Sequence, residues 1–291
     1  LESHVIGDPT FRFAPVPESV DVDGLLLQNK VSSWKKLLKS PLPDVQSLAI
    51  EQLRRAGALS SADLLRIYRE SPYGVVRLEA LMALSATPDD HFITAVTEAS
   101  QDAYELVQRQ AIRFIAKNGD RRLIPALIRL SIANNTSDRC NFNVMTALAC
   151  FPKEDLLAEF DRQFDAPSVQ YLDKNNLRGK IRNTIAHSAD RLTTDIDKVV
   201  KGEASEKDRT FTIRALRNTL PHHKVPELLV YLQDCGDGNT QILLLEALGW
   251  HTVSCHAADI AATALKMSED ASLPDAVRQE ALKTYRRIHE K

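Results

Sequence analysis

Histidine and cysteine side chains gather in the C-terminal third of the chain at spacings that suit a zinc ion. His251 and Cys255 are four residues apart, which would place two ligands on one face of a helix, and His256 follows directly. Cys235 could supply a third ligand. However, residues 252–254 are typical of a turn, and no fourth ligand stands at a regular spacing. We therefore expect an ordinary turn between helices here, without a metal.

The segment from Asp234 to Asn239 superficially resembles a calcium-binding loop. Loops of the EF-hand type need oxygen ligands at alternating positions, a glycine at the sixth position and a bidentate glutamate at the end. Here Asp234 and Asp237 are three residues apart, and the glutamate is missing from its place. We interpret this segment as a glycine-rich turn between helices.

Motifs of the common enzyme classes are absent from the sequence. It contains no glycine-rich phosphate loop, no G-x-S-x-G nucleophile turn and no H-E-x-x-H helix. Serine, histidine and aspartate are plentiful, but no spacing pairs them. We therefore expect no catalytic residue and no cofactor in this chain.

Long polar and basic side chains in the central part of the chain carry the remaining chemical signal. They are Gln108, Arg109, Arg113, Asn141, Asn143, Arg178, Lys180 and Arg182. On the inner surface of a helical superhelix, such groups would donate charge-assisted hydrogen bonds to an acidic or extended peptide. The alternative is a solvated helix face that binds nothing.

One sequence pattern predicts the helices that would position these side chains. In Tyr73–Leu84 (YGVVRLEALMAL), small and aliphatic residues follow a helical period from Val76 onward, which suits close contact with other helices. The same frame recurs at Val45, Val107, Cys140, Leu177, Asp208, Leu243 and Val277. The intervals are 31, 31, 33, 37, 31, 35 and 34 residues. One helix signature per thirty-odd residues indicates an α-solenoid.

This pattern resembles the HEAT-repeat family, in which each unit is a pair of antiparallel helices and the second carries a "VR..A..AL" face. VVRLEALMAL (residues 75–84) and AVRQEAL (residues 276–282) are the nearest matches. The resemblance covers about residues 31–291. It implies an all-α fold: an α-α superhelix of about eight HEAT-like helical hairpins, preceded by a short irregular N-terminal arm.

In the HEAT family, the arginine after the valine bonds polar groups of the neighbouring repeat. The resemblance assigns this role to Arg77, Arg178, Arg209 and Arg278, whereas Gln46, Gln108, Asn141 and Leu244 depart from it. We call Val76 and the seven residues at which its frame recurs the reference residues. Short polar residues stand five positions before several of them, at Ser40, Ser71, Asp102, Asn135 and Ser272. We expect them in the turns between paired helices, where they accept backbone N–H bonds.

Local signals predict several helix boundaries. Pro43 and Asp44 suit a helix start, because first-turn N–H groups lack intrahelical acceptors. Residues 87–90 should precede another helix, and Asn118-Gly119-Asp120 should end one. Within the longest interval, residues 164–171 are typical of an inserted loop, or else of simple drift in repeat length.

Residues 1–28 differ from the rest, with three prolines and two glycines in the first 24 positions. We expect an extended arm here, with the solenoid in residues 29–291. The segment HVIGDPTFRF (residues 4–13) resembles the closing segment of gingipain-type, caspase-like cysteine peptidases. That resemblance implies a C-terminal accessory domain of a larger secreted or envelope peptidase, whose catalytic residues would precede Leu1. The alternative is a Gly-Asp-Pro turn in a linker.

Charge and composition narrow the classes of partner. The chain has 37 basic and 39 acidic residues, a net charge of −2, so nucleic acid is an unlikely partner. Its four cysteines form no CxxC pair, which favours small buried side chains. No apolar run reaches the 18 residues of a membrane span. We expect the protein in the cell envelope or outside the cell if the peptidase resemblance holds, and in the cytoplasm otherwise.

The leading hypothesis is a non-catalytic scaffold that binds a protein or peptide on the concave face of a HEAT-like superhelix. The peptidase accessory domain is the alternative and is compatible with it. A HEAT-like DNA glycosylase would need aromatic and acidic residues on a strongly basic face, but Trp34 and Trp250 are far apart in the sequence. A HEAT protein of the bilin lyase type has no supporting motif.

The repeat frame predicts that Val76→Asp unfolds or splits the helical array. The substitution places a charge in the interhelix core, which costs several kcal/mol when the charge has no partner. Circular dichroism and thermal unfolding would measure the effect. A variant with wild-type helicity and thermal stability would show that the frame is wrong.

Overall fold

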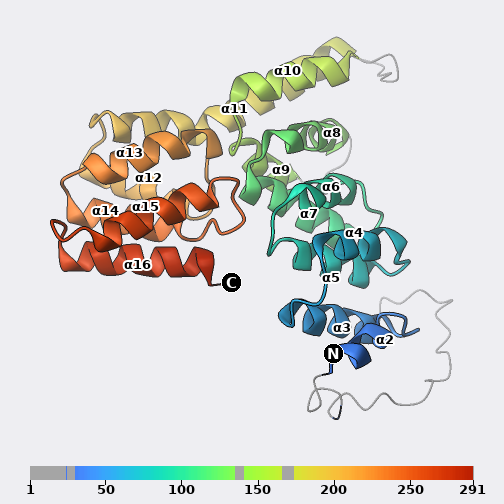
Figure 1. Cartoon of the computed structure of the whole chain (residues 1–291). Coiled ribbons are helices and arrows are strands. Elements are labelled where there is room, and N and C mark those ends of the chain that lie inside the picture. The colour runs from blue at the N-terminus through green and yellow to red at the C-terminus, as the bar shows by residue number, and fades with distance from the viewer. Residues whose placement is uncertain (1–23, 25–29, 135–140, 166–173, 291) are drawn as a thin grey trace, which may run out of the picture. The chain divides into compact units, whose positions relative to one another are not determined.

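The computed structural model describes residues 24, 30–134, 141–165 and 174–290. These belong to two compact units, residues 1–58 and 59–291. Regular structure in the described residues is entirely helical, with fifteen α-helices, two short 3-10 helices and no strand (Figure 1). The predicted all-α class is confirmed. The peptidase-like residues 4–13 lie outside the described residues.

The first unit contains α2 (Val31–Leu37) and α3 (Pro43–Arg55), which pack against each other. Pro43 occupies the first turn of α3, as predicted, where its missing N–H removes no intrahelical bond. Trp34 and Leu53 are buried in this pair. A buried Trp34 is not available to line a groove.

The second unit begins with α4 (Ser61–Glu70), α5 (Gly74–Leu84), α6 (Asp90–Ala99), α7 (Glu105–Asn118), η1 (Arg121–Leu123) and α8 (Ile124–Asn134). It continues with α9 (Asn141–Leu148), α10 (Lys153–Phe164), α11 (Lys174–Val200), α12 (Glu206–Leu216) and η2 (His222–Lys224). It ends with α13 (Val225–Asp234), α14 (Gly238–Leu248), α15 (Ala257–Glu269) and α16 (Asp275–His289). No described helix is both long and apolar enough to cross a membrane.

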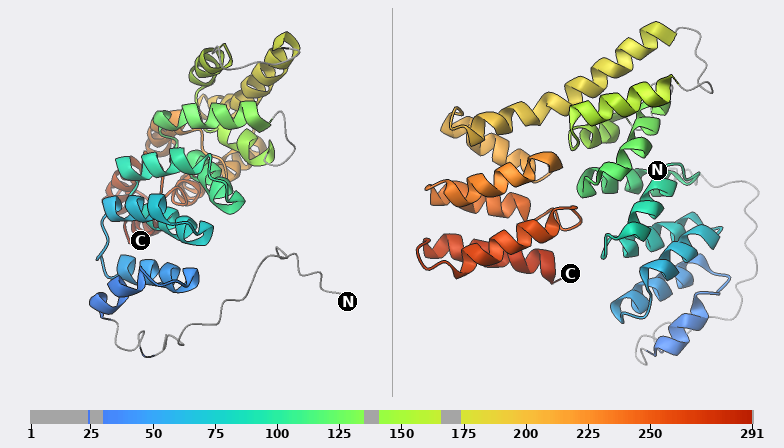
Figure 2. Two further views of the ribbon diagram at one scale, coloured as in Figure 1. Left: turned by 90° about the vertical axis from the view of Figure 1, so that its right-hand side faces the viewer. Right: turned by 45° about the horizontal axis from the view of Figure 1, so that its top comes forward.

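Most helices of the second unit contact the helix two places along the chain, and many also contact the next one. The helices α5, α7, α9, α11, α12, α14 and α16 contact one another in that order, and we call them the α5–α16 series. Among the remaining helices, α4 packs on α6, α8 on α10 and α13 on α15. Figures 1 and 2 show α15 and α16 side by side at the C-terminal end.

Short polar side chains cap the starts of α4 and α6, and the cap of α6 lies in the predicted segment 87–90. Asp89 accepts hydrogen bonds from the N–H groups of His91 and Phe92 at the start of α6. Ser60 and Asp63 form a reciprocal capping box at the start of α4. Gly119 ends α7 in the left-handed conformation, with φ of 73°, as expected for the Asn118-Gly119-Asp120 stop.

The helix α11 departs from the two-helix unit. Such a unit would place a turn soon after Leu177. Instead, α11 is a single helix of 27 residues that ends only at Val200. It contains no proline, and its only glycine, Gly179, lies near its start. The chain therefore meets no helix-ending signal before Gly202, which has φ of 72°. The predicted insertion falls largely outside the described residues, although α10 ends at Phe164.

Arg77 bonds to a neighbouring turn, as the resemblance implies for its position. Its Nη2 and Nε donate to the two carboxylate oxygens of Asp102 at 2.7 and 2.8 Å, and its Nη1 donates to the Ser71 carbonyl. Asp102 also accepts from the Tyr104 N–H at 2.8 Å and from the Tyr68 hydroxyl at 3.1 Å. This network joins the α4–α5 hairpin to the turn before α7.

The other residues that directly follow a reference residue differ in their hydrogen-bond and ion-pair partners. Arg209 reaches Asp237 of the next turn at 3.3 Å, but Arg278 pairs only with Asp275 of its own helix among the described residues. Gln46 and Gln108 donate instead to the carbonyls of Ser40 and Ser100. In these two places glutamine substitutes for arginine, because an amide N–H satisfies a helix-end carbonyl equally well.

The environment of Asp102 keeps it ionised. Burial by itself would raise the pKa of its carboxyl, but hydrogen bonds from Arg77, Tyr104 and Tyr68 outweigh burial and lower the pKa. The pKa of Tyr68 is raised by burial and by the Asp102 charge. Only 5% of the Asp102 side chain is exposed, so its charge interactions are weakly screened.

We predict that Asp102→Ala lowers the free energy of unfolding at pH 7 by about 3 kcal/mol, because it leaves Arg77 without its buried partner. Since the folded-state pKa of Asp102 lies below the unfolded value, its contribution is complete above that unfolded value. It disappears as the pH falls through the folded pKa. Urea unfolding at pH 7 and pH 3 should show a smaller difference at pH 3.

The exposed pair Arg69–Glu98 provides the control for this test, because Glu98→Ala removes a carboxylate of the same hairpin region from a solvated site. We expect little change in stability from it. Equal losses in the two variants would contradict the role assigned to Asp102.

Candidate functional site

The predicted binding residues of α7 divide into structural and exposed side chains. Gln108 is half-buried and donates to the Ser100 carbonyl at 3.1 Å, so it supports the turn. Arg109 is exposed and pairs with Glu105 at 2.7 Å, and Arg113 is also exposed. On α9, Asn143 is half-buried, while the side chain of Asn141 lies outside the description.

The predicted basic residues of α11 are largely neutralised by α10. Arg178 donates to Asp165 at 2.9 Å and to Asp161 at 2.8 Å, and Arg182 lies 3.7 Å from Asp161. Lys180 is exposed. The positive charge of this stretch therefore holds α10 against α11, and less of it faces a partner than the sequence alone indicates.

Exposed apolar side chains occur on α5 and α7, the second of which also carries Arg109 and Arg113. Val75 and Met82 are 37% and 43% exposed and lie two turns apart on one side of α5. Leu106 of α7 is 47% exposed. Val75 and Leu106 each precede a reference residue by one position, and Met82 and Arg113 follow one by six. Because α5 packs on α7, we infer that these matched positions and Arg109, which lies between Leu106 and Arg113 on α7, share one surface. We call it the α5–α7 face: Val75, Met82, Leu106, Arg109 and Arg113.

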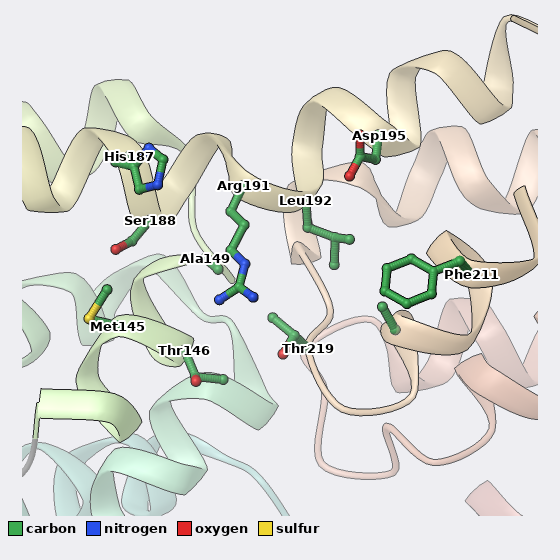
Figure 3. A pocket seen from close by; sticks show the side chains of 11 residues that line it. Met145, Thr146, Ala149, His187, Ser188, Arg191, Leu192, Asp195, Phe211 and Thr219 are labelled. Atoms are coloured by element: carbon green, nitrogen blue, oxygen red, sulfur yellow. The ribbon is translucent and has the colours of Figure 1, made fainter. Parts of the chain in front are cut away.

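A cavity of about 420 Å³ lies between α9, α11 and α12 (Figure 3). Its volume is within the range of small-molecule and side-chain sites. We call it the α11 pocket; it is lined by Met145, Thr146, Ala149, His187, Ser188, Arg191, Leu192, Asp195, Phe211, Ala215 and Thr219. This site was not predicted from the sequence, because its residues come from three separated segments.

The polar wall of the α11 pocket comes from one face of α11. His187, Arg191 and Asp195 are spaced by four residues, so they lie along one side of the helix, and Ser188 and Leu192 lie beside them. Figure 3 shows the Arg191 side chain extending from α11 into the space between α9 and α12. This four-residue stripe was the signal in the sequence, but the predicted basic stretch stopped at Arg182.

Ser188 is a buried hydroxyl without a hydrogen-bond partner. Its residue is 3% exposed, and its Oγ makes no hydrogen bond with any described group. A helical serine often bonds the carbonyl four residues earlier, but no such bond forms here. An unsatisfied buried hydroxyl costs about 1–3 kcal/mol. Ser188 is therefore a donor with unused capacity in the wall of the pocket.

The histidines and cysteines meet in a different place, at a junction of loops. The Nε2–H of His222 donates to the Ala116 carbonyl at 2.9 Å, and its Nδ1 accepts from the Ser254 hydroxyl at 3.0 Å. The backbone N–H of Cys255 donates to the Asn118 carbonyl at 2.8 Å. We call this the histidine junction. It joins the end of α7 to loops more than a hundred residues later.

Gly119 permits this close contact. A Cβ at this position would lie 2.0 Å from the His222 ring, and the backbone φ of 73° is itself unfavourable for other residues. The glycine therefore serves both the turn after α7 and the packing of His222.

The chemistry of the junction favours packing over metal binding. Burial lowers the pKa of His222 to about 3, and both ring nitrogens are engaged. Burial raises the pKa of the Cys150 and Cys255 thiols to about 12 and about 11, so both are protonated at neutral pH. Within the described ranges, no three His, Cys, Asp or Glu side chains converge on a metal position. The turn predicted between His251 and Cys255 is confirmed, because α14 ends at Leu248 and α15 begins at Ala257.

Comparison with known protein families gives no matching family model, and no curated protein matches the chain. The roles of the α5–α7 face and the α11 pocket therefore follow from their geometry and chemistry.

We predict that the histidine junction makes the fold sensitive to mild acid. The pKa of His222 is near 6.5 when unfolded and about 3 when folded, so its contribution is complete above pH 6.5 and declines as the pH falls toward 3. Between pH 7 and pH 5 this histidine alone should remove about 2 kcal/mol of stability. In His222→Gln, denaturant unfolding should give lower stability at pH 7 and a weaker dependence on pH.

His289 on α16 is exposed and serves as the matched control. His289→Gln should leave both the stability and its pH dependence as in the unchanged protein. If His222→Gln shows the same loss between pH 7 and pH 5 as the unchanged protein, the assignment to His222 is wrong.

Proposed function

We propose that this chain is a non-catalytic scaffold of HEAT-like helical hairpins stacked as an α-solenoid, and that its α5–α7 face binds an extended peptide segment of a partner protein. The stacking is supported by contacts of helices with their second neighbours along the chain. It is also supported by the sequence period of thirty-odd residues. Both are properties of stacked hairpins, in which each unit buries its apolar side against the next.

The observation that carries the proposal is the apolar exposure of α5. One side of this helix is buried through Val76, Ala80 and Leu84, yet Val75 and Met82 on another side remain exposed. A helix that is apolar around most of its circumference normally has both sides covered. Leu106 extends the exposed apolar surface onto α7. Exposed apolar side chains gathered on two packed helices support an interaction surface here.

The charges beside the patch indicate the chemistry of the partner. Arg113 lies two turns after Leu106 on the same side of α7, whereas Arg109 between them is already paired with Glu105. A peptide with apolar side chains beside acidic ones would cover the patch and accept charge-assisted hydrogen bonds. Apolar anchors supply most of the affinity, and the charges set orientation and partner choice.

We predict that selection from a random peptide library with this protein enriches sequences that combine acidic and apolar residues. Fluorescence anisotropy with a selected peptide should then show about tenfold weaker binding to Val75→Lys, equivalent to about 1.4 kcal/mol. The added charge would have to be desolvated under the peptide. Circular dichroism should show unchanged helicity.

Val230 on α13 is a second exposed valine, outside the α5–α16 series, and Val230→Lys is the matched control. It should bind the peptide as the unchanged protein does. Equal affinity of Val75→Lys and the unchanged protein, or a selection without acidic enrichment, would contradict the proposal.

A further inference from the structure

We propose that the α11 pocket holds the carboxylate of an acidic side chain of the bound peptide, with Arg191 as its cation and Ser188 as a hydroxyl donor. This inference rests on the proposed function, because the peptide that crosses the α5–α7 face is the ligand. It adds a second, chemically specific subsite on α9, α11 and α12 to that surface.

Arg191 is the side chain best placed to bind an anion. Its guanidinium extends into the pocket (Figure 3). Among the described residues it forms no ion pair within 4.0 Å, whereas Arg178 earlier on α11 is held by two aspartates. A guanidinium presents parallel N–H donors that match the two oxygens of a carboxylate. Arg191 therefore retains its full donor capacity for a ligand.

Ser188 supplies the second observation. It lies one turn before Arg191, lines the same pocket and is 97% covered, with no partner for its Oγ. Its Oγ is covered and points away from Arg191 (Figure 3), so the side chain must turn about its Cα–Cβ bond to reach a carboxylate in the pocket; that turn would satisfy a donor that the unliganded protein leaves unpaired. Ligand binding would thus remove an existing cost as well as form a new bond.

Asp195 fixes where in the pocket the carboxylate lies. It is one turn beyond Arg191 and reaches Lys198 only at 4.0 Å, so the α12 end of the pocket carries a negative charge. A ligand carboxylate is repelled from that end and is favoured at the end lined by His187 and Ser188. The charge distribution along α11 therefore gives the peptide an orientation.

The apolar part of the pocket suits a neighbouring side chain of the same peptide. Phe211 is 74% exposed and borders two further hollows besides the α11 pocket. Leu192 lies on the Phe211 side of the pocket, and Met145 lines the opposite side, near Ser188 (Figure 3). A large aromatic side chain exposed among hollows is typical of a binding hot spot, because a partner side chain fills the hollow and covers the ring.

The pocket continues the α5–α7 face along the same series of helices. Thr146 follows its reference residue, Cys140, by six positions, as Met82 and Arg113 follow theirs. The helices α7 and α9 pack on each other, and α9 packs on α11. A peptide bound along these matched positions of α5 and α7 would therefore reach the pocket at α9.

The three methionines of the chain allow a direct test by methyl NMR. Met145 lines the pocket, Met82 lies on the α5–α7 face, and Met267 is buried at 4% exposure in the core. With ¹³C-methyl methionine, each site gives one signal. The probe is a Gly-Ser peptide with a central Leu-Glu pair, acetylated and amidated at its ends, and the comparison peptide carries Leu-Gln.

We predict that the Leu-Glu peptide shifts the Met145 signal at millimolar concentration and leaves Met267 unchanged. The Leu-Gln peptide should bind at least tenfold more weakly. Arg191→Gln and Ser188→Ala should each weaken the Met145 response by at least threefold. Arg286→Gln removes an equal charge from an exposed position of α16 that lines neither the pocket nor the two further hollows, and it should have no effect.

Ser188→Ala also separates binding from folding. Because the Ser188 Oγ makes no bond in the folded protein, its removal should leave the melting temperature unchanged or higher. A weaker Met145 response in a variant of undiminished stability therefore reports on the ligand contact itself.

The two methyl signals distinguish the two proposals. Movement of Met82 without Met145 would overturn the carboxylate subsite and leave the α5–α7 face supported. Movement of Met145 without Met82 would support the subsite and contradict the face. An equal Met145 response to both peptides, or a full response in Arg191→Gln, would overturn the carboxylate assignment, and no response at either methionine would overturn both.

Discussion

Burial of each helix against two neighbours is the constraint on which the second unit depends. Small and aliphatic residues at a helical period give α5, α7 and their successors a side that fits closely against other helices, as at Val76, Ala80 and Ala111. A helix cannot bury this side by itself, so its stability depends on the helices packed against it. The exposed apolar residues of α5 are informative because they lie outside this packing and are not explained by it.

Polar side chains serve the same packing at the turns. Helix-end carbonyls need donors when they are buried, and Arg77, Gln46 and Gln108 provide them with different chemistry. Charged side chains also bond within the chain, because Arg178 and Arg182 of α11 pair with Asp161 of α10. A basic residue in such a protein is therefore a weak indicator of a ligand until its partners within the chain are known. Arg191 stands out by this criterion.

The histidine junction adds contacts between segments that are far apart in the sequence. Through His222 and Asn118 the end of α7 is bonded to the loops before α13 and after α14, far along the sequence. Contacts between distant segments cost more chain entropy than contacts between neighbours, and they hold the separated hairpins in one geometry. The junction thereby links two parts of the second unit independently of the helices between them.

The sequence by itself determined the helical class, the approximate positions of many helices and several of their caps, because these depend on local periodicity and on turn chemistry at residues such as Pro43, Asp89 and Gly119. It also indicated the cross-hairpin bond of Arg77. Tertiary structure decided which charges remain for a partner, since the pairing of Arg178 and the burial of Ser188 depend on helices distant in sequence. It also decided that His222 packs against α7 and that α9, α11 and α12 enclose a pocket. These features arise from contacts between separated segments, which no local pattern records.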